Sequence, residues 1–285
     1  MDFIQGEKFF EVADSTYALK VKMPDDYYNL ANTVNWNELK DVNVIYTHTM
    51  YVTALFNIIK YLEQKFIIIT HNSDCRIEKQ GIITPAGNNI QRKIEPCSIP
   101  DNVIKWYSTN VNMIHPKLVS IPIGVENKRW QGNPSKKEQM INKVKEPREW
   151  RNLLYICHAI GTNVAQRAEP YKLFEGKPWV TSHAGHNRVP FDVFIDNIYH
   201  HKFMICPEGN GIDCHRTWEC LYVGTIPIEK RNINNQFYTD LPICFVDEWS
   251  EITKMFLDKE YKRIKNSTWN LDKLDFEYWK NKILT

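Results

Sequence analysis

The residues best suited to chemistry are concentrated in one segment, residues 203–229, which reads F-M-I-C-P-E-G-N-G-I-D-C-H-R-T-W-E-C-L-Y-V-G-T-I-P-I-E. Its apolar start predicts a strand over 203–206, and a helix is predicted over 213–223 with Asp213 as N-cap. A helix N-terminus offers free N–H groups and the positive end of the helix dipole. The loop between strand and helix is therefore suited to bind a phosphate group.

This loop carries the four residues that we assign to phosphate binding, Glu208, Gly209, Asn210 and Gly211. Gly209 and Gly211 allow a ligand to approach the backbone closely because they lack a side chain. The sequence is neither G-x-G-x-x-G nor a Walker A motif. A dinucleotide-dependent oxidoreductase and a P-loop kinase or ATPase are therefore disfavoured.

The predicted helix continues the polar cluster with His215, Arg216, Thr217 and Glu219. Helical spacing allows His215, Arg216 and Glu219 to share one face. Arg216 could clamp a phosphate with two hydrogen bonds, and Glu219 could accept hydrogen bonds from two ribose hydroxyls. The alternative is a surface salt bridge between Arg216 and Glu219. Spacing alone does not separate the two interpretations, and the loop before the helix favours ligand binding.

Elsewhere the chain alternates predicted strands and helices, which indicates right-handed βαβ units and parallel sheets. The second half contains helices at 164–174, 191–199 and 248–264, and strands at 153–157, 179–182, 226–229 and 243–246. The first half contains strands at 42–46, 66–70, 103–107 and 118–121, with a helix at 51–64.

The boundary between the halves is expected in a polar, Lys- and Glu-rich stretch. We predict an N-terminal domain at 1–135, a linker at 136–150 and a C-terminal domain at 151–265. Residues 266–285 are expected to form a C-terminal helix that packs back on the N-terminal domain.

The pattern G-N-G-x-D-x-H-R-T-W-E-x-L-x-x-G-x-I-P, followed by L-P-I-C-F-V-D-E-W-S-E-I-T, resembles the C-terminal domain of exostosin-like glycosyltransferases. It is most similar to the short soluble forms encoded by large DNA viruses of algae, such as chlorovirus xylosyltransferases. T-H-N-S-D at 70–74, H-P-K-L-V-S-I-P-I-G at 115–124 and T-N-V-A-Q-R at 162–167 resemble further elements of that family. The likeness covers residues 66–255.

The resemblance implies the GT-B fold, two Rossmann-like domains with parallel sheets facing across a cleft. It implies an inverting transferase that needs no obligatory metal or other cofactor. The C-terminal domain would bind a nucleotide-sugar, and a UDP-sugar is the expected donor. Xylose is one candidate sugar, and the acceptor would be a hydroxyl of an oligosaccharide or of a glycoprotein glycan. Glu208 departs from the family pattern, which often has a basic residue there, so the donor sugar stays open. The Golgi members also carry an N-terminal membrane anchor that is not evident here.

Within that framework, Asp74 is the preferred catalytic base because it follows the apolar strand at 66–70, and His71 is the second candidate. The alternative for Asp74 is a turn or helix cap. Arg167 and Arg216 would stabilise the leaving diphosphate in place of a metal. The turn at 182–186, represented by Ser182 and His183, could line the pocket for the base of the nucleotide.

Composition excludes several other classes. A net charge of +2, from 36 basic and 34 acidic residues, does not favour nucleic-acid binding. No apolar run approaches the length of a membrane span and the start does not resemble a signal peptide, so we expect a cytoplasmic protein, in the host cytoplasm if the gene is viral. Seven irregularly spaced cysteines suggest reduced thiols. An inactive, lectin-like protein that binds nucleotide-sugar or glycan remains the alternative function.

Overall fold

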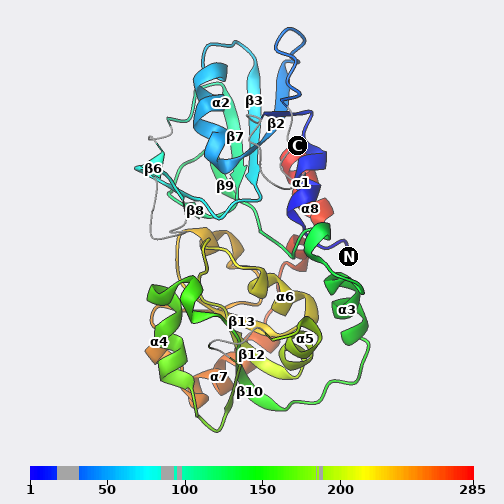
Figure 1. Cartoon of the computed structure of the whole chain (residues 1–285), viewed down its shortest axis with the longest axis vertical. Helices are drawn as coiled ribbons and strands as arrows, with labels where there is room; N and C mark the ends of the chain where they lie inside the picture. The colour runs from blue at the N-terminus through cyan, green and yellow to red at the C-terminus, as the bar shows by residue number, and fades with distance from the viewer. Residues whose placement is uncertain (18–31, 85–92, 95–97, 184, 186–188) are drawn as a thin grey trace. The chain divides into compact units, whose positions relative to one another are not determined.

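The computed structural model describes residues 1–17, 32–84, 93–94, 98–183, 185 and 189–285. These residues form two compact units (Figure 1), which we call the N-terminal unit and the C-terminal unit. The N-terminal unit comprises Gln5–Ile123 and Phe276–Thr285, and the C-terminal unit comprises Met1–Ile4 and Gly124–Asp275. Each unit contains its own five-stranded parallel sheet, which confirms the prediction of an α/β chain with two Rossmann-like units.

The sheet of the N-terminal unit has the order β1-β2-β3-β7-β9, and all of its neighbouring strands are parallel. Spatial order follows chain order, so the sheet has no reversal. In its central strand β3 all residues except Lys65 and Ile67 are buried, as expected for a strand covered on both faces. The strands are β1 (Ser15–Tyr17), β2 (Val42–His48), β3 (Lys65–His71), β7 (Val103–Ser108) and β9 (Leu118–Ser120).

Aromatic side chains attach the helices of the N-terminal unit to this sheet. Phe9 of α1 (Gly6–Val12) stacks on His71 with 5.0 Å between ring centroids. Phe276 of α8 (Phe276–Leu284) meets Phe9 edge-on at 5.2 Å. Phe56 of α2 (Val52–Ile59) packs edge-on against Trp106 of β7 at 5.2 Å. The remaining elements are η2 (Thr49–Tyr51) and a small sheet of order β6-β5-β4-β8, built from β4 (Arg76–Glu78), β5 (Gly81–Ile83), β6 (Lys93–Ile94) and β8 (Val111–Asn112).

The sheet of the C-terminal unit has the order β11-β10-β12-β13-β14 and is also parallel throughout. Chain order reverses between β10 and β12, because β11 lies on the other side of β10. In open α/β sheets ligands bind outside the carboxyl ends of the strands at such a reversal. The strands are β10 (Asn152–Ile156), β11 (Val180–Ser182), β12 (His201–Ile205), β13 (Ile226–Lys230) and β14 (Cys244–Val246).

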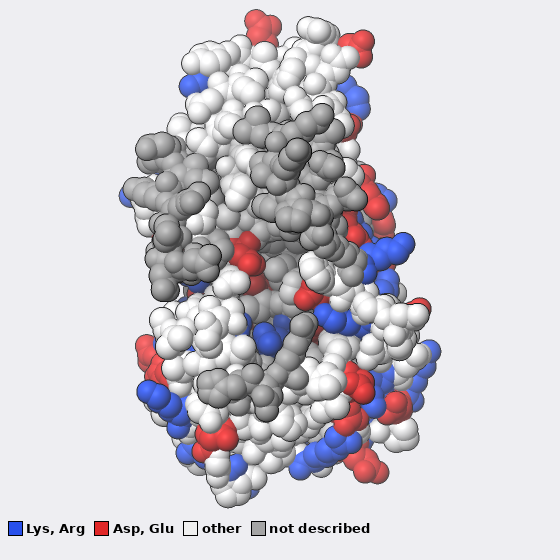
Figure 2. Space-filling model, in the orientation of Figure 1, with Lys and Arg blue, Asp and Glu red and all other residues white. Residues whose placement is uncertain are grey.

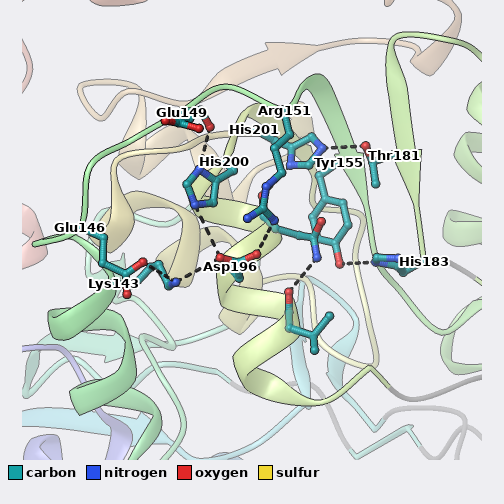
Figure 3. A network of polar contacts seen from close by, with 12 residues as sticks. Lys143, Glu146, Glu149, Arg151, Tyr155, Thr181, His183, Asp196, His200 and His201 are labelled. Atoms are coloured by element: carbon teal, nitrogen blue, oxygen red, sulfur yellow. Dashed lines mark hydrogen bonds and ion pairs between the residues drawn. The ribbon is translucent and has the colours of Figure 1, made fainter.

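Three helices of the C-terminal unit, α3 (Lys136–Lys143), α5 (Phe191–Tyr199) and α6 (His215–Val223), contact one another. Asp196 of α5 forms ion pairs with Lys143 at 3.1 Å and with Arg151, which precedes β10 (Figure 3). These contacts fasten α3 and the start of β10 to α5. The other elements are α4 (Val164–Phe174), α7 (Lys254–Lys265), η4 (Lys128–Trp130), η5 (Ile160–Thr162), η6 (Asn234–Tyr238), η7 (Trp249–Glu251) and η8 (Leu271–Leu274).

The observed boundaries differ from the expected ones. The units divide at Ile123–Gly124 instead of residue 135, and residues 136–150 belong to the C-terminal unit instead of forming a linker. The helix α3 begins there with a capping box made by Ser135 and Glu138, and its Met140 is buried. The charged composition of this stretch concealed an amphipathic helix in which Met140 is the one fully buried residue. Residues 276–285 lie in the N-terminal unit.

Regular structure at the chain start and after β3 was not expected, because the segments involved are very short. The helix expected at 248–264 is divided into η7 and α7, and the one expected at 51–64 ends at Ile59. Within the described residues, no helix is long and apolar enough to cross a membrane.

Gly124 should be one of the least replaceable residues of the fold. Its φ is +68°, and a Cβ there would lie 2.2 Å from the carbonyl oxygen of Ile4. We expect Gly124→Ala to lower the free energy of unfolding of the C-terminal unit by about 2–4 kcal/mol, measured by denaturant titration. Gly161→Ala is the control, since nothing lies within 4 Å of its added Cβ. Equal stability of the two variants would contradict the strained geometry.

Candidate functional site

Two arginines lie where the chain order of the C-terminal sheet reverses. Arg167, in the first turn of α4, is 3% exposed, and its Nε donates to the carbonyl of Glu208 at 2.9 Å. Its Nη1 donates to the carbonyl of Ala159, which follows β10, at 3.1 Å. The side chain therefore bridges the loops that leave β10 and β12. Burial lowers the pKa of Arg167, and the nearby positive charge of Arg216 lowers it further.

Arg216 is held in a comparable way in the first turn of α6. Its Nε donates to the carbonyl of Cys157 at 2.7 Å, directly after β10. Neither arginine forms an ion pair with a carboxylate within the described part of the chain, and the alternative salt bridge between Arg216 and Glu219 is not made. The two guanidinium groups are close enough for the charge of one to lower the pKa of the other, and their hydrogen-bond partners among the described residues are backbone carbonyls and, for Arg167, the Cys214 thiol. Such a pair favours an anion, because a bound phosphate would relieve the repulsion between the two charges.

The loop after β12 is shaped around Arg167. A Cβ on Gly209 would lie 2.8 Å from Nη2 of Arg167, so a larger residue here would force the guanidinium group to shift. The Gly209 carbonyl accepts a hydrogen bond from Asn163 Nδ2 at 2.9 Å, and its N–H donates to Gly211 at 3.0 Å. Asn210 is exposed at the tip of the loop. The group that lies closest to Gly209 is an arginine of the protein itself, and the approach of a ligand there stays a prediction.

The helix after the loop begins later than expected. Cys214, not Asp213, is the N-cap of α6, and the Cys214 side chain makes no capping hydrogen bond. The prediction for Asp213 is wrong because its buried carboxylate accepts a hydrogen bond from the Trp218 indole at 2.9 Å. An uncapped N-terminus leaves N–H groups available to a ligand. His215 is engaged nearby, with Nδ1 2.7 Å from the Gly124 carbonyl.

Glu219 is the most unusual acidic residue of this region. It is 5% exposed and forms no hydrogen bond or ion pair with the described residues. Burial raises its pKa, and the nearby charges of His215 and Arg216 oppose that rise. Its charge also acts on the Cys157 thiol beyond β10. A buried carboxylate without a donor is costly unless a ligand supplies one, which fits the predicted ribose contact.

Two further glutamates, Glu229 and Glu208, interact electrostatically beside the loop. Glu229 accepts hydrogen bonds from the Thr217 hydroxyl and from Asn235 Nδ2, the latter at 3.1 Å. Burial raises the pKa of Glu229 to about 7, and the charge of Glu208 adds to this effect. Asn232 Nδ2 is 3.4 Å from a carboxylate oxygen of Glu208. The hydroxyl of Thr217 is thus used within the protein.

The segment after β11 reaches the same edge of the sheet. Ser182 ends β11, and the exposed His183 continues the pairing by donating its N–H to Ile156 at 2.8 Å. Gly185 pairs with Ala159, which also accepts from Arg167. Residues 184 and 186 of the expected turn lie outside the described part. Ser182 and His183 are therefore near the arginines in the same unit.

Several residues of this edge were not expected from the sequence. His158 is 2% exposed, and its Nε2 lies 3.0 Å from the carbonyl of Arg167. Asn163 and Glu229 also contact the loop or helix described above. Glu229 could have been found from its place at the carboxyl end of a predicted strand. The positions of His158 and Asn163 depend on the conformation of an irregular loop, which no helical or strand-like spacing of residues predicts.

The two predicted catalytic residues belong to the N-terminal unit. Asp74 follows β3, is exposed, and its carboxylate has no hydrogen bond or ion pair with the described residues. His71 is 1% exposed, and its Nε2 is 3.0 Å from the Pro122 carbonyl. Its Nδ1 accepts the Asn72 N–H at 2.7 Å. Because both ring nitrogens of His71 are engaged, Asp74 is the better candidate for a base.

The surface charges and the cysteines agree with the expectations of no basic stripe and of reduced thiols. Figure 2 shows acidic and basic side chains interspersed on the visible face, without a continuous basic stripe among the described residues there. The six described cysteines are all buried and form no disulfide. Within the described residues, no cluster of three or more His, Cys, Asp or Glu side chains is arranged to hold a metal ion. Activity without a metal stays a prediction.

Comparisons with known proteins give only remote structural likenesses. The sequence matches no known family profile and no curated protein. A DNA-modifying β-glucosyltransferase, solved with and without its substrate uridine diphosphoglucose, aligns over 85% of this chain and 73% of its own, with 8% identity and a TM-score of 0.31. The GtfA/B complex aligns over 87% of this chain and 54% of its own, with 12% identity and a TM-score of 0.33. Scores this low carry no functional weight, so function must be inferred from the residues of this chain.

Burial of His158 should make the stability of the C-terminal unit depend on pH. Burial lowers the pKa of His158 to about 4, below the ordinary 6.5. Below pH 6.5 the unfolded chain therefore binds a proton that the folded protein excludes. We expect the free energy of unfolding to fall by about 2–3 kcal/mol between pH 6.5 and pH 4 on account of this residue.

The measurement is denaturant titration at several pH values on the wild type and His158→Gln, whose amide can still donate to the Arg167 carbonyl. The variant should lose this part of the pH dependence. His183→Gln, at an exposed histidine of the same unit, is the control and should retain it. Parallel pH profiles of the wild type and His158→Gln would show that His158 titrates normally.

Proposed function

We propose that this protein is a glycosyltransferase whose C-terminal unit binds the diphosphate of a nucleotide-sugar between Arg167 and Arg216. The observation that carries the proposal is two electrostatically interacting guanidinium groups at the reversal of a parallel sheet, held by backbone carbonyls and without a carboxylate partner among the described residues. Because phosphoryl oxygens match the guanidinium geometry, a diphosphate would satisfy both groups. The uncapped N-terminus of α6 supports the same ligand.

Glu219 would hold the nucleoside part of the donor. Its side chain is buried and has no hydrogen-bond or ion-pair partner among the described residues, while Arg216 lies three residues before it on the same helix. Ribose hydroxyls are neutral donors that can pair with a carboxylate while a phosphate group binds the neighbouring cation. The site thus offers positive charge for the diphosphate and negative charge for the sugar hydroxyls of one ligand.

The proposed reaction moves the sugar to a hydroxyl of a glycan with inversion at the anomeric carbon. The arginines and the helix N-terminus would stabilise charge on the leaving diphosphate without a metal. Asp74 would accept the proton of the attacking hydroxyl, since its carboxylate is exposed and has no partner in the part of the chain that the structure describes. The G-N-G-x-D-x-H-R-T-W-E resemblance supports an exostosin-like enzyme that uses a UDP-sugar, with xylose as one candidate.

Binding of the nucleotide alone should separate the roles of the arginine and the glutamate. We expect Glu219→Ala to weaken UDP binding by about 1.5–3 kcal/mol and to leave inorganic pyrophosphate binding unchanged, measured by calorimetry. Arg216→Ala should weaken both ligands, because it removes a phosphate contact.

Glu260→Ala and Arg263→Ala on α7 are the matched controls, since these residues form a surface ion pair at 2.8 Å. Neither should change the binding of UDP or pyrophosphate. If Glu219→Ala and Arg216→Ala are folded and bind both ligands like the wild type, the donor site lies elsewhere.

Asp74→Asn should preserve donor binding while lowering turnover, because the amide keeps the shape and loses the basic oxygen. A positioned base contributes about 10²- to 10⁴-fold, so nucleotide release from the accepted UDP- or GDP-sugar should slow by that factor. The assay is run in EDTA, so that activity there also tests the proposed independence from metals. Asp101→Asn, an exposed acid of the same unit, is the control.

The same assay tests the alternative function. A binding protein would bind nucleotide-sugars and release no nucleotide from any of them. More than about a tenth of the activity in Asp74→Asn would remove that residue as the base.

A further inference from the structure

A buried tyrosine contacts the exposed imidazole at the edge of the proposed donor site. The phenol oxygen of Tyr155 is 3.0 Å from Nδ1 of His183 (Figure 3). The register pairs Tyr155 of β10 with Thr181 of β11, two residues before His183, so these side chains share one face of the sheet. On that face the ring of His201 lies 5.2 Å from the Tyr155 ring, and its Nε2 is 2.7 Å from the Thr181 hydroxyl.

We propose that Tyr155 is a positioning residue that fixes the tautomer of His183, so that His183 presents an Nε2–H donor to a carbonyl group of the donor nucleobase. The inference rests on the proposed function, because it concerns the base of the same nucleotide-sugar. It adds a specificity that the diphosphate and ribose contacts cannot provide, since every nucleotide carries those groups.

The tautomer follows from the surroundings of the phenol. Tyr155 is fully buried, and burial raises its pKa, so the phenol keeps its proton and must donate it. The thiol of Cys157 also hydrogen-bonds the phenol; its pKa is raised by burial, and a protonated thiol is a weak acceptor. The ring nitrogen of His183 is the better acceptor. A neutral imidazole that accepts at Nδ1 carries its proton at Nε2.

The segment of His183 is tied to the loop that holds the arginine. The N–H of Gly185 donates to the His158 carbonyl at 3.3 Å, and Gly185 pairs with Ala159. Ala159 in turn accepts the hydrogen bond from Nη1 of Arg167. If the diphosphate of a nucleotide binds to Arg167, His183 therefore lies in the chain segment next to that nucleotide.

Glu219 lies near the same strand end. Its charge acts on Cys157, which shares a face of β10 with Tyr155. The proposed ribose carboxylate and the imidazole of His183 thus both lie near the carboxyl end of β10. This is the order that a nucleoside requires, with its ribose at Glu219 and its base at His183.

The chemistry of the base edge selects among nucleotides. Guanine and uracil present a carbonyl oxygen where adenine and cytosine present an amino group. A fixed Nε2–H donor of His183 can donate a hydrogen bond to the carbonyl oxygen of guanine or uracil. In adenine and cytosine the same donor would meet an amino group, which is also a donor. The protein should therefore prefer UDP to CDP, and GDP to ADP.

Calorimetry with UDP, CDP and inorganic pyrophosphate on the wild type and Tyr155→Phe tests this inference. The wild type should bind UDP more tightly than CDP. In Tyr155→Phe, no phenol donates to Nδ1 of His183, so the imidazole is no longer restricted to one tautomer. UDP binding should then weaken by about two- to tenfold, and the ratio of UDP to CDP affinity should move toward one. Pyrophosphate affinity should not change. GDP and ADP provide the same comparison if the protein prefers purines.

Two further variants separate positioning from general damage. Tyr199→Phe removes a comparable buried hydroxyl, which donates to the Glu146 carbonyl at 2.7 Å, and should keep the wild-type ratio. His183→Gln replaces the imidazole with an amide that has no tautomers. Adding Tyr155→Phe to His183→Gln should therefore have no further effect on the ratio.

Equal affinity of the wild type for the carbonyl and amino nucleotides, or an unchanged ratio in Tyr155→Phe, would overturn the inference. So would a loss of pyrophosphate binding in Tyr155→Phe, which would indicate general disruption of the site. If the wild type binds neither pyrophosphate nor any nucleotide, the proposed donor site itself fails.

Discussion

The proposed donor site depends on how the positive charge of two arginines is held. Arg167 and Arg216 are fixed by the carbonyls of Glu208, Ala159 and Cys157, which orient the guanidinium groups without neutralising them. A carboxylate in the same place would cancel the charge and leave little affinity for an anion. Carbonyl partners therefore keep the site rigid and cationic at once, which suits electrostatic stabilisation of a leaving group.

The carboxyl groups nearby show the complementary arrangement. Glu229 is satisfied by Thr217 and Asn235, and it helps to hold α6 beside β13. Glu219 is buried on the same helix and has no such partner among the described residues. Two glutamates in one small region thus differ physically, because one is satisfied by protein donors and the other has no donor among the described residues.

The two sheets explain why the donor site is assigned to the C-terminal unit. Both are parallel and five-stranded, yet only the order β11-β10-β12-β13-β14 contains a reversal. At a reversal, the connections from neighbouring strands pass to opposite faces and leave space at the carboxyl edge. The order β1-β2-β3-β7-β9 has no such point within the described strands, which separates the units by topology before any side chain is considered.

The sequence by itself determined the strand and helix alternation, the loop around Gly209, and the candidacy of Arg167, Arg216 and Glu219, because these depend on local pattern and residue type. It could not place Asp213, whose carboxylate pairs with Trp218 instead of capping the helix, or α3, whose polar composition resembles a linker. Strand order, the carbonyl partners of the arginines and the contact of Tyr155 with His183 were decided only by the tertiary structure. The physical reason is that hydrogen bonds between segments distant in the sequence produce no periodic pattern in the sequence from which they could be predicted.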